Sequence, residues 1–179
     1  MFYVSEVKNT PPTAFGNDLQ QLVYGTLEKL RIPFERVDTD EAISMNDCVL
    51  IDERLDMKTV KTLFLCNRQK TDFYLYITTA QKPFITKDFS ATMGTPRLSF
   101  ASEELLMDKL GVKIGAATVF GVLLDTKNEI KVVIDKDVLT EEWYGCSDGT
   151  TTGYMKLKTV HVVELFLDFA KHKPIIIGI

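Results

Sequence analysis

The residues of this chain that could do chemistry are a cation, several hydroxyls and exposed backbone. Lys61 begins the apolar run KTLFL, where a fixed cation could hold a phosphate or a carboxylate, although the pattern alone favours a solvated lysine. Ser99 lies in RLSFAS and could face a ligand, and GAAT at 115–118 allows close approach to the backbone. Asp148 and Gly149 have the composition of a tight turn. Together these residues are the materials of a small polar pocket.

Motifs for metal or nucleophilic chemistry are missing from the sequence. It has no G-x-x-x-x-G-K-[ST] phosphate loop, no G-x-S-x-G nucleophile elbow and no H-E-x-x-H zinc motif. Its two histidines, His161 and His172, do not share a face of the last predicted helix, so we expect them at the surface or capping that helix. We therefore expect no metal site and no cofactor.

The three cysteines are Cys48, Cys66 and Cys146. Their odd number and the lack of C-x-x-C spacing argue against a disulfide framework, and free thiols indicate a reducing compartment. Cys48 and Cys66 lie in predicted apolar strands. Cys146 lies in the predicted turn GCSDG and is the best candidate for a reactive thiol, but no nearby histidine in the sequence would activate it. A thiol enzyme is therefore the weakest of the functional hypotheses.

Length and charge limit the class of protein. A chain of 179 residues with 45% hydrophobic and 26% charged residues is expected to form one folded domain. The net charge of −4 excludes a global basic surface for duplex nucleic acid, but Lys58, Arg68 and Lys70 could form a basic rim near Lys61. The N-terminus lacks the pattern of a secretion signal and no apolar run approaches a membrane span, so we expect a cytoplasmic protein.

The elements that must position the candidate residues alternate irregularly between helix and strand. Residues 1–17 are expected to form an extended arm ending in a turn, and residues 18–179 the folded domain. Helical spacing and capping residues predict helices at Leu19–Leu30, Thr86–Met93, Ser102–Leu110 and Val160–Lys171. Apolar runs predict strands at Phe34–Val37, Cys48–Ile51, Val60–Cys66, Phe73–Thr78, Arg97–Phe100, Ala117–Leu124, Ile130–Ile134, Thr150–Leu157 and Pro174–Ile177.

Two pairs of these strands are predicted to form hairpins. The first joins Val60–Cys66 to Phe73–Thr78, and the second joins Ala117–Leu124 to Ile130–Ile134 through TKNE. The last strand, PIII, is expected to be buried. The pattern is that of a mixed α/β domain and not of a repeating βαβ array.

Four segments resemble the YbaK/ProX family, and within it the free-standing prolyl-tRNA deacylase-like proteins. They are KTLFL at 61–65, RLSFASEELLMDKLGV at 97–112, GAATVFGVLLD at 115–125 and KVVIDKDVL at 131–139. RLSFASEE followed by a helix and then G-x-x-x-x-F is fairly specific in combination, and the resemblance runs from about Leu19 to Ile177. It implies a single mixed-sheet, partly barrel-like α/β domain with packed helices.

The resemblance also implies an activity and a partner. Family members hydrolyse the ester of a mischarged aminoacyl-tRNA, typically alanine on the proline tRNA, without a metal. Lys61 matches the family's lysine, which is expected to hold the phosphate or the 3′-terminal adenosine of the tRNA. Gly115 matches the family's glycine turn, whose backbone amides are expected to face the ester. The other residues expected to bind the tRNA end are Thr62, Ser99, Ala116, Ala117, Thr118 and Asp148.

Such a reaction suits the residues present. An aminoacyl ester is already activated, so placement, oxyanion-type donors and a water positioned with help from the vicinal ribose hydroxyl are sufficient. The chain departs from the family pattern at Thr62, at Val119 and at Gly145-Cys146, where relatives have Asn, Pro and a His-Pro pair. These departures motivate an alternative, a non-catalytic binding or regulatory module of the same fold that recognises a tRNA end or a small amino-acid ligand.

Overall fold

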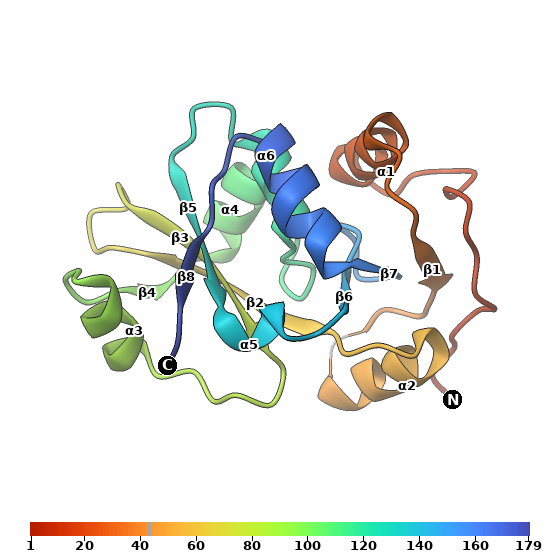
Figure 1. Cartoon of the computed structure of the whole chain (residues 1–179), viewed down its shortest axis with the longest axis horizontal. Helices are drawn as coiled ribbons and strands as arrows, with labels where there is room; N and C mark the ends of the chain where they lie inside the picture. The colour runs from red at the N-terminus through yellow and green to blue at the C-terminus, as the bar shows by residue number, and fades with distance from the viewer. Residues whose placement is uncertain (43) are drawn as a thin grey trace.

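The structure, a computed structural model, describes residues 1–42 and 44–179 and has its strands in two sheets (Figure 1). The antiparallel three-stranded sheet has the order β1 (Glu35–Asp38), β7 (Gly153–Lys158), β6 (Trp143–Ser147). The five-stranded sheet has the order β4 (Ser99–Phe100), β2 (Val60–Cys66), β3 (Phe73–Thr79), β5 (Ile130–Asp135), β8 (Ile175–Ile177). Both sheets meet at the start of β2, where Thr59 forms a parallel bridge with Gly145. The mixed α/β architecture is confirmed, with two sheets in place of one.

Short helices cover these sheets. They are α1 (Asp18–Leu30), α2 (Met45–Leu55), α3 (Thr86–Met93), α4 (Glu103–Leu105) continued by the π-helical η1 (Leu106–Leu110), the 3₁₀-helix η2 (Val119–Leu124), α5 (Lys136–Leu139), and the π-helical η3 (His161–Phe166) continued by α6 (Leu167–Phe169). Local signals set several of their ends. Asn17 caps α1 by accepting from the Gln20 amide at 2.8 Å, and Ser102 caps α4 by accepting from the Leu105 amide at 3.2 Å.

The two faces of the five-stranded sheet carry different cores because neighbouring strand residues point to opposite sides. Phe64 and Cys66 of β2 face the larger core, which α1, η2 and η3 cover. Leu63 and Leu65 face a smaller core, which Phe89 of α3 covers. A third cluster lies between α2 and the three-stranded sheet, with Ile51, Leu55, Val37, Ala42 and Tyr154 as its buried members.

Two sequence predictions are wrong because a short apolar run has no decisive periodicity. Cys48–Ile51 lies inside α2, which a capping box between Ser44 and Asp47 begins. The predicted strand Ala117–Leu124 is largely η2, which Thr118 caps. The second hairpin therefore does not exist. Instead β5 pairs in parallel with β3 and with β8.

Smaller differences concern the last third of the chain. Residues 145–147 of the predicted GCSDG turn belong to β6, and only the end of that segment turns. The strand at Ile175–Ile177 was expected to be buried, but it is the edge strand of its sheet, and Ile175 and Ile176 are exposed. An edge strand has a neighbour on one side only, so it retains more exposed surface.

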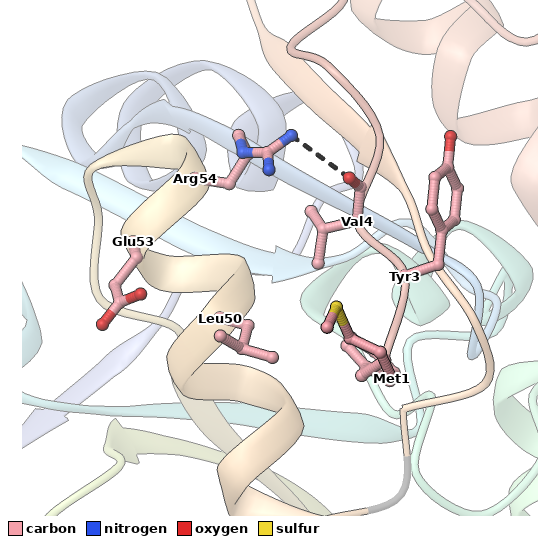
Figure 2. Close-up of a pocket in the computed structure, with 7 residues that line it drawn as sticks. Met1, Tyr3, Val4, Leu50, Glu53 and Arg54 are labelled. Carbon is pink, nitrogen blue, oxygen red and sulfur yellow. Dashed lines mark hydrogen bonds between the residues drawn. The ribbon is translucent and has the colours of Figure 1, made fainter.

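Residues 4–10 of the N-terminal arm lie along β1. Val4 bridges Thr39 and Lys8 bridges Arg36, both antiparallel. Arg36, only 4% exposed, and Lys8 each lie 2.8 Å from the Asp38 carboxylate. Figure 2 shows the other side of the arm, where Arg54 of α2 donates to the Val4 carbonyl at 3.1 Å. The arm thus covers the edge of the three-stranded sheet. No helix among the described residues is long and apolar enough to cross a membrane.

Candidate functional site

The Gly115 turn is a β-turn from Lys113 to Ala116, closed by the Ala116 amide donating to the Lys113 carbonyl at 3.1 Å. Gly115 has φ +88°, which is typical of the third position of a type II turn and favours glycine. A Cβ there would have space, since its nearest atoms, in Ala42 and Thr151, are 3.9 Å away, so the backbone conformation is what requires glycine. Within the described chain, the amides of Gly115 and Ala117 donate no hydrogen bond. They are available to an incoming oxygen.

Asp148 organises the loop opposite this turn. Its carboxylate is 1% exposed and accepts from the Gln20 amide group at 2.9 Å and the Tyr24 hydroxyl at 2.8 Å. It also accepts from the amide and the hydroxyl of Thr150, at 3.2 and 2.8 Å. Burial, and then the negative charge of Asp148, raises the pKa of Tyr24. The four donors fix the loop against α1, so Asp148 positions its neighbours rather than facing solvent.

A pocket of about 390 Å³ lies between these two segments. We call it the threonine pocket, and it is lined by Gly16, Asn17, Glu41, Met107, Gly111, Lys113, Ala116, Gly149, Thr150, Thr151 and Thr152. Both ends of the Gly115 turn contribute to its wall. Its polar groups are hydroxyls, backbone and one charge of each sign, and the Thr151 hydroxyl donates to Glu41 at 3.2 Å. Its volume suits a small polar ligand.

Lys61 lies on the other face of the five-stranded sheet. Its side chain has the same direction as Leu63 and Leu65, toward the smaller core, and its ammonium donates to the Lys82 carbonyl. Within the described residues it has no carboxylate partner, and burial lowers its pKa. By contrast the Lys82 ammonium lies 2.6 Å from Asp135 and 2.7 Å from Asp137. Lys61 therefore does not line the threonine pocket.

The remaining predicted site residues do not all lie in one place. Thr62 is half-buried and faces the larger core, as Ala116 does. Thr118 is fully buried and its hydroxyl accepts from the Phe120 amide at 3.5 Å. Ala117, which lies between Ala116 and Thr118 in the sequence, is half-buried. Ser99 is exposed and pairs with Cys66, about 16 Å along β2 from Lys61.

Cys146 is not suited to be a nucleophile. It lies in β6, is 2% exposed, and burial raises its pKa, so the thiol stays protonated near neutral pH. Sequence reasoning missed several pocket residues, above all Glu41, Lys113 and Thr151. The three consecutive threonines after Gly149 were the available signal, because hydroxyls beside a glycine turn are exposed donors and acceptors.

The environment of His172 also differs from the expectation of a surface residue. It is 3% exposed, and its Nε2 lies 2.7 Å from the Asp125 carboxylate. Its Nδ1 lies 2.6 Å from the Ala170 carbonyl near the end of α6, so the capping part of that expectation fits the contact. This pair ties the end of α6 to the turn before β5. In the part of the chain that the structure describes, no cluster of three His, Cys, Asp or Glu side chains could hold a metal ion.

Comparisons with known proteins place the chain in a family. A model of the aminoacyl-tRNA editing domain matches residues 51–165. A relative from Acetoanaerobium sticklandii, the prolyl-tRNA editing protein ProX, is 32% identical over 123 residues, which are 68% of this chain and 74% of the relative. The prolyl-tRNA synthetase associated domain-containing protein 1 of Danio rerio is 26% identical over 164 residues, 90% of this chain and 88% of the relative.

Solved structures agree on the fold. A crystal structure of a protein proposed to be a trans-editing enzyme for prolyl tRNA synthetase has a TM-score of 0.65 at 15% identity, over 90% of this chain and 98% of that one. A crystal structure of the hypothetical protein APE2540 has a TM-score of 0.63 at 12% identity, over 86% and 96%. With the sequence match across the core of the domain, these findings show that the chain belongs to the aminoacyl-tRNA editing domain family, the YbaK/ProX family.

Proposed function

We propose that this protein is a trans-editing deacylase that acts in the cytoplasm and hydrolyses a mischarged aminoacyl-tRNA. The substrate that we propose is Ala-tRNA(Pro). The observation that carries the proposal is the Gly115 turn, whose free amides lie beside a small polar pocket in a chain of an editing family. The relative named ProX supports prolyl-tRNA as the substrate class.

In this proposal the Gly115 turn binds the oxygen on which negative charge develops. Water attacks the ester carbonyl, the carbonyl oxygen becomes an oxyanion, and the amides of Gly115 and Ala117 donate to it. When the carbonyl forms again, the bond to the ribose oxygen breaks, and that oxygen leaves with a proton from the attacking water, giving free amino acid and tRNA. The vicinal ribose hydroxyl of the tRNA helps to place the water. No protein nucleophile is required, which fits the buried and protonated Cys146.

Selectivity in this proposal comes from size. The threonine pocket would receive the amino-acid side chain, with Ala116 on one wall and Thr150 to Thr152 on the other. The space that remains for the side chain once the tRNA end is bound would reject a larger side chain by steric overlap, which is the principle of a second editing sieve. The Asp148 carboxylate keeps the pocket's wall in place through its hydrogen bonds to Thr150.

We assign Lys61 and Ser99 to contacts with the tRNA, and Thr62 and Thr118 to the support of the Gly115 turn. The Lys61 ammonium lacks a carboxylate partner within the described residues, so it can hold a phosphate, although it does so from the other face of the sheet. Thr62 and Thr118 support the turn from the larger core, and Ser99, being exposed, is available to the tRNA strand only at a distance from the ester.

The experiment that tests the proposal follows the loss of label from Ala-tRNA(Pro) with time. We expect hydrolysis well above the spontaneous rate, with Pro-tRNA(Pro) spared as the matched control. Intact Ala-tRNA(Pro), together with intact Ser-tRNA and Gly-tRNA, would contradict the enzyme hypothesis.

One observation favours the alternative of a binding module. Lys61 and the Gly115 turn lie on different faces of the sheet, so the cation that matches the family's lysine does not sit beside the amides proposed to face the ester. Binding of uncharged tRNA(Pro) without any acceleration of deacylation would support that alternative and exclude the enzyme.

A further inference from the structure

The seam between the two sheets holds a second enclosed pocket, of about 340 Å³. We call it the Trp143 pocket. Its walls are apolar, from Trp143, Val60 and Val138, and its rim carries Asp52, Lys58 and Glu141. The start of β2, the start of β6 and the end of α2 meet here, and the Thr59–Gly145 bridge closes the seam. None of the residues predicted to act on the ester lines it.

One aromatic ring dominates this pocket. Trp143 is half-buried, and the ammonium of Lys156, itself only 8% exposed, lies 4.5 Å from the ring centroid. This cation–π contact fixes the ring within the sheet surface. A held aromatic face with apolar neighbours is a stacking platform for a planar group, and every nucleobase has such a face.

The polar rim selects among planar groups. The Oδ1 atom of Asp52 accepts from both the amide and the hydroxyl of Thr59, whereas Oδ2 shares only the Thr59 amide, at 3.2 Å. Oδ2 therefore retains free lone pairs. Burial raises the pKa of Asp52, so a further N–H donor would stabilise its charged form. The exocyclic amino group of a base could donate to Oδ2 of Asp52, whereas the carbonyl oxygen of a base would be repelled by it.

The same rim keeps phosphates outside. Lys58, whose side chain is 77% exposed, pairs with Glu141 at 2.8 Å at the mouth of the pocket. Two carboxylates near the walls disfavour an anion inside, while the exposed ammonium suits a phosphate at the entrance. A base inside with its backbone outside is the usual arrangement for recognition of single-stranded RNA.

We infer that the Trp143 pocket binds an unpaired, amino-bearing base of RNA, cytosine in particular, stacked on Trp143 and donating its amino group to Asp52. The inference rests on the proposed function for the source of that base, the CCA end of tRNA. Trp143 and Ser147 are the two ends of β6, about 13 Å apart along the strand, and the loop that lines the threonine pocket follows Ser147, so the base is a cytosine upstream of the aminoacylated adenosine.

The experiment uses the whole chain and its single tryptophan as the probe. Trp143 fluorescence is titrated with the dinucleotides CC and UU, which lack the amino group of adenine. We expect saturable quenching by CC, and binding of UU on the order of fivefold weaker, since one hydrogen bond is replaced by a repulsion. No saturable change with CC, or equal affinities for the two, would overturn the inference.

A reversal of preference makes the test sharper. In Asp52→Asn the Thr59 donors hold the side-chain oxygen in the Oδ1 position, so the amide NH₂ replaces Oδ2. That variant should bind UU better than CC. Glu53→Gln is the matched control, with the same charge change one residue along α2, in the region that Figure 2 shows and outside the Trp143 pocket. An identical response of both variants would reduce the effect to net charge and overturn the inference.

Deacylation of Ala-tRNA(Pro) is measured in parallel and separates the two proposals. Selective CC binding without deacylation refutes the proposed function and retains the pocket. Deacylation with no response of Trp143 refutes the pocket alone. Trp143→Leu, read by the anisotropy of labelled CC, should weaken binding on the order of tenfold, as expected for the loss of one stacking contact.

Discussion

The two faces of the five-stranded sheet carry different chemical groups, although β2 contributes side chains to both. On one face, the Gly115 turn offers backbone amides beside hydroxyls, and the nearby Asp148 carboxylate has four donors. On the other face, the Lys61 ammonium has only a carbonyl as partner, while Lys82 is held by two carboxylates. The first face can stabilise developing negative charge at a fixed point. The second can hold a charge that is already there.

This difference predicts different kinetic roles for the Gly115 turn and for Lys61, which the family resemblance assigns to one site. Backbone donors that act on the transition state change kcat, whereas a cation that binds a remote phosphate changes KM. If the Gly115 face does the chemistry and the Lys61 face holds the tRNA, mutations on the two faces should separate in that way.

The largest effect is expected from Gly115→Ala. Its φ of +88° is unfavourable for alanine, so the turn should relax and move the free amides away from the ester. We expect kcat for Ala-tRNA(Pro) to fall on the order of 100-fold, the loss of one oxyanion donor. Gly94→Ala is the matched control, because Gly94 has φ +65° and equally open space, but ends α3 elsewhere. An equal fall in both variants would remove the special role of the Gly115 turn.

The next largest effect is expected from Asp148→Asn, and it is a loss of folding stability. The amide group can accept through one oxygen only, so Gln20 and Tyr24 or both donors of Thr150 lose their partner in a buried site. We expect unfolding free energy to fall by about 2 kcal/mol, measured by urea denaturation. Activity per folded molecule should fall as well, since the threonine loop loses its support. Unchanged activity in the folded fraction would show that the loop does not shape the site.

Lys61→Ala is expected to act on binding. We predict an increase in KM on the order of tenfold with kcat nearly unchanged, and a salt dependence of tRNA binding reduced by about one phosphate contact. Lys87→Ala, an exposed lysine on α3 over the same face, controls for net charge. A fall in kcat with constant KM would place Lys61 at the ester and would remove the division between the faces.

Much of the fold follows from local signals. Asn17 and Ser102 cap helices through their own side chains, and alternating apolar residues with a polar turn predict the β2–β3 hairpin. These features depend on neighbours within a few residues, which the sequence displays directly. Short apolar runs such as CVLI and VFGVLL do not, because so few residues cannot separate the period of a helix from the alternation of a strand.

The candidate site was less predictable because its parts meet only through distant contacts. Lys61 and Thr62 are adjacent in β2 and therefore point to opposite faces, but which face meets the larger core depends on long-range packing. The threonine pocket joins residues from Gly16 to Thr152, and the partner of Asp148 is a helix more than a hundred residues earlier. No local pattern encodes such pairings.

The smallest effect is expected from the Asp125–His172 pair, which lies outside both candidate sites. Burial alone would raise the pKa of Asp125, but hydrogen bonds from His172 and from the amides of Ile130 and Glu129 outweigh it and hold that pKa below its usual range. A carboxyl with a lowered folded pKa contributes stability above its unfolded pKa of about 3.9 and loses it as pH falls through the folded pKa.

We therefore expect the unfolding free energy of the wild type to fall by about 1–2 kcal/mol more than that of Asp125→Asn between pH 5 and strongly acidic pH, as for one hydrogen bond to a charged group. Urea denaturation at each pH measures this difference. Parallel curves for the two proteins would mean that the hydrogen bonds to Asp125 do not lower its pKa in the folded state. Deacylation per folded molecule should be unchanged in Asp125→Asn, since the pair ties α6 to the turn before β5 and touches neither face of the site.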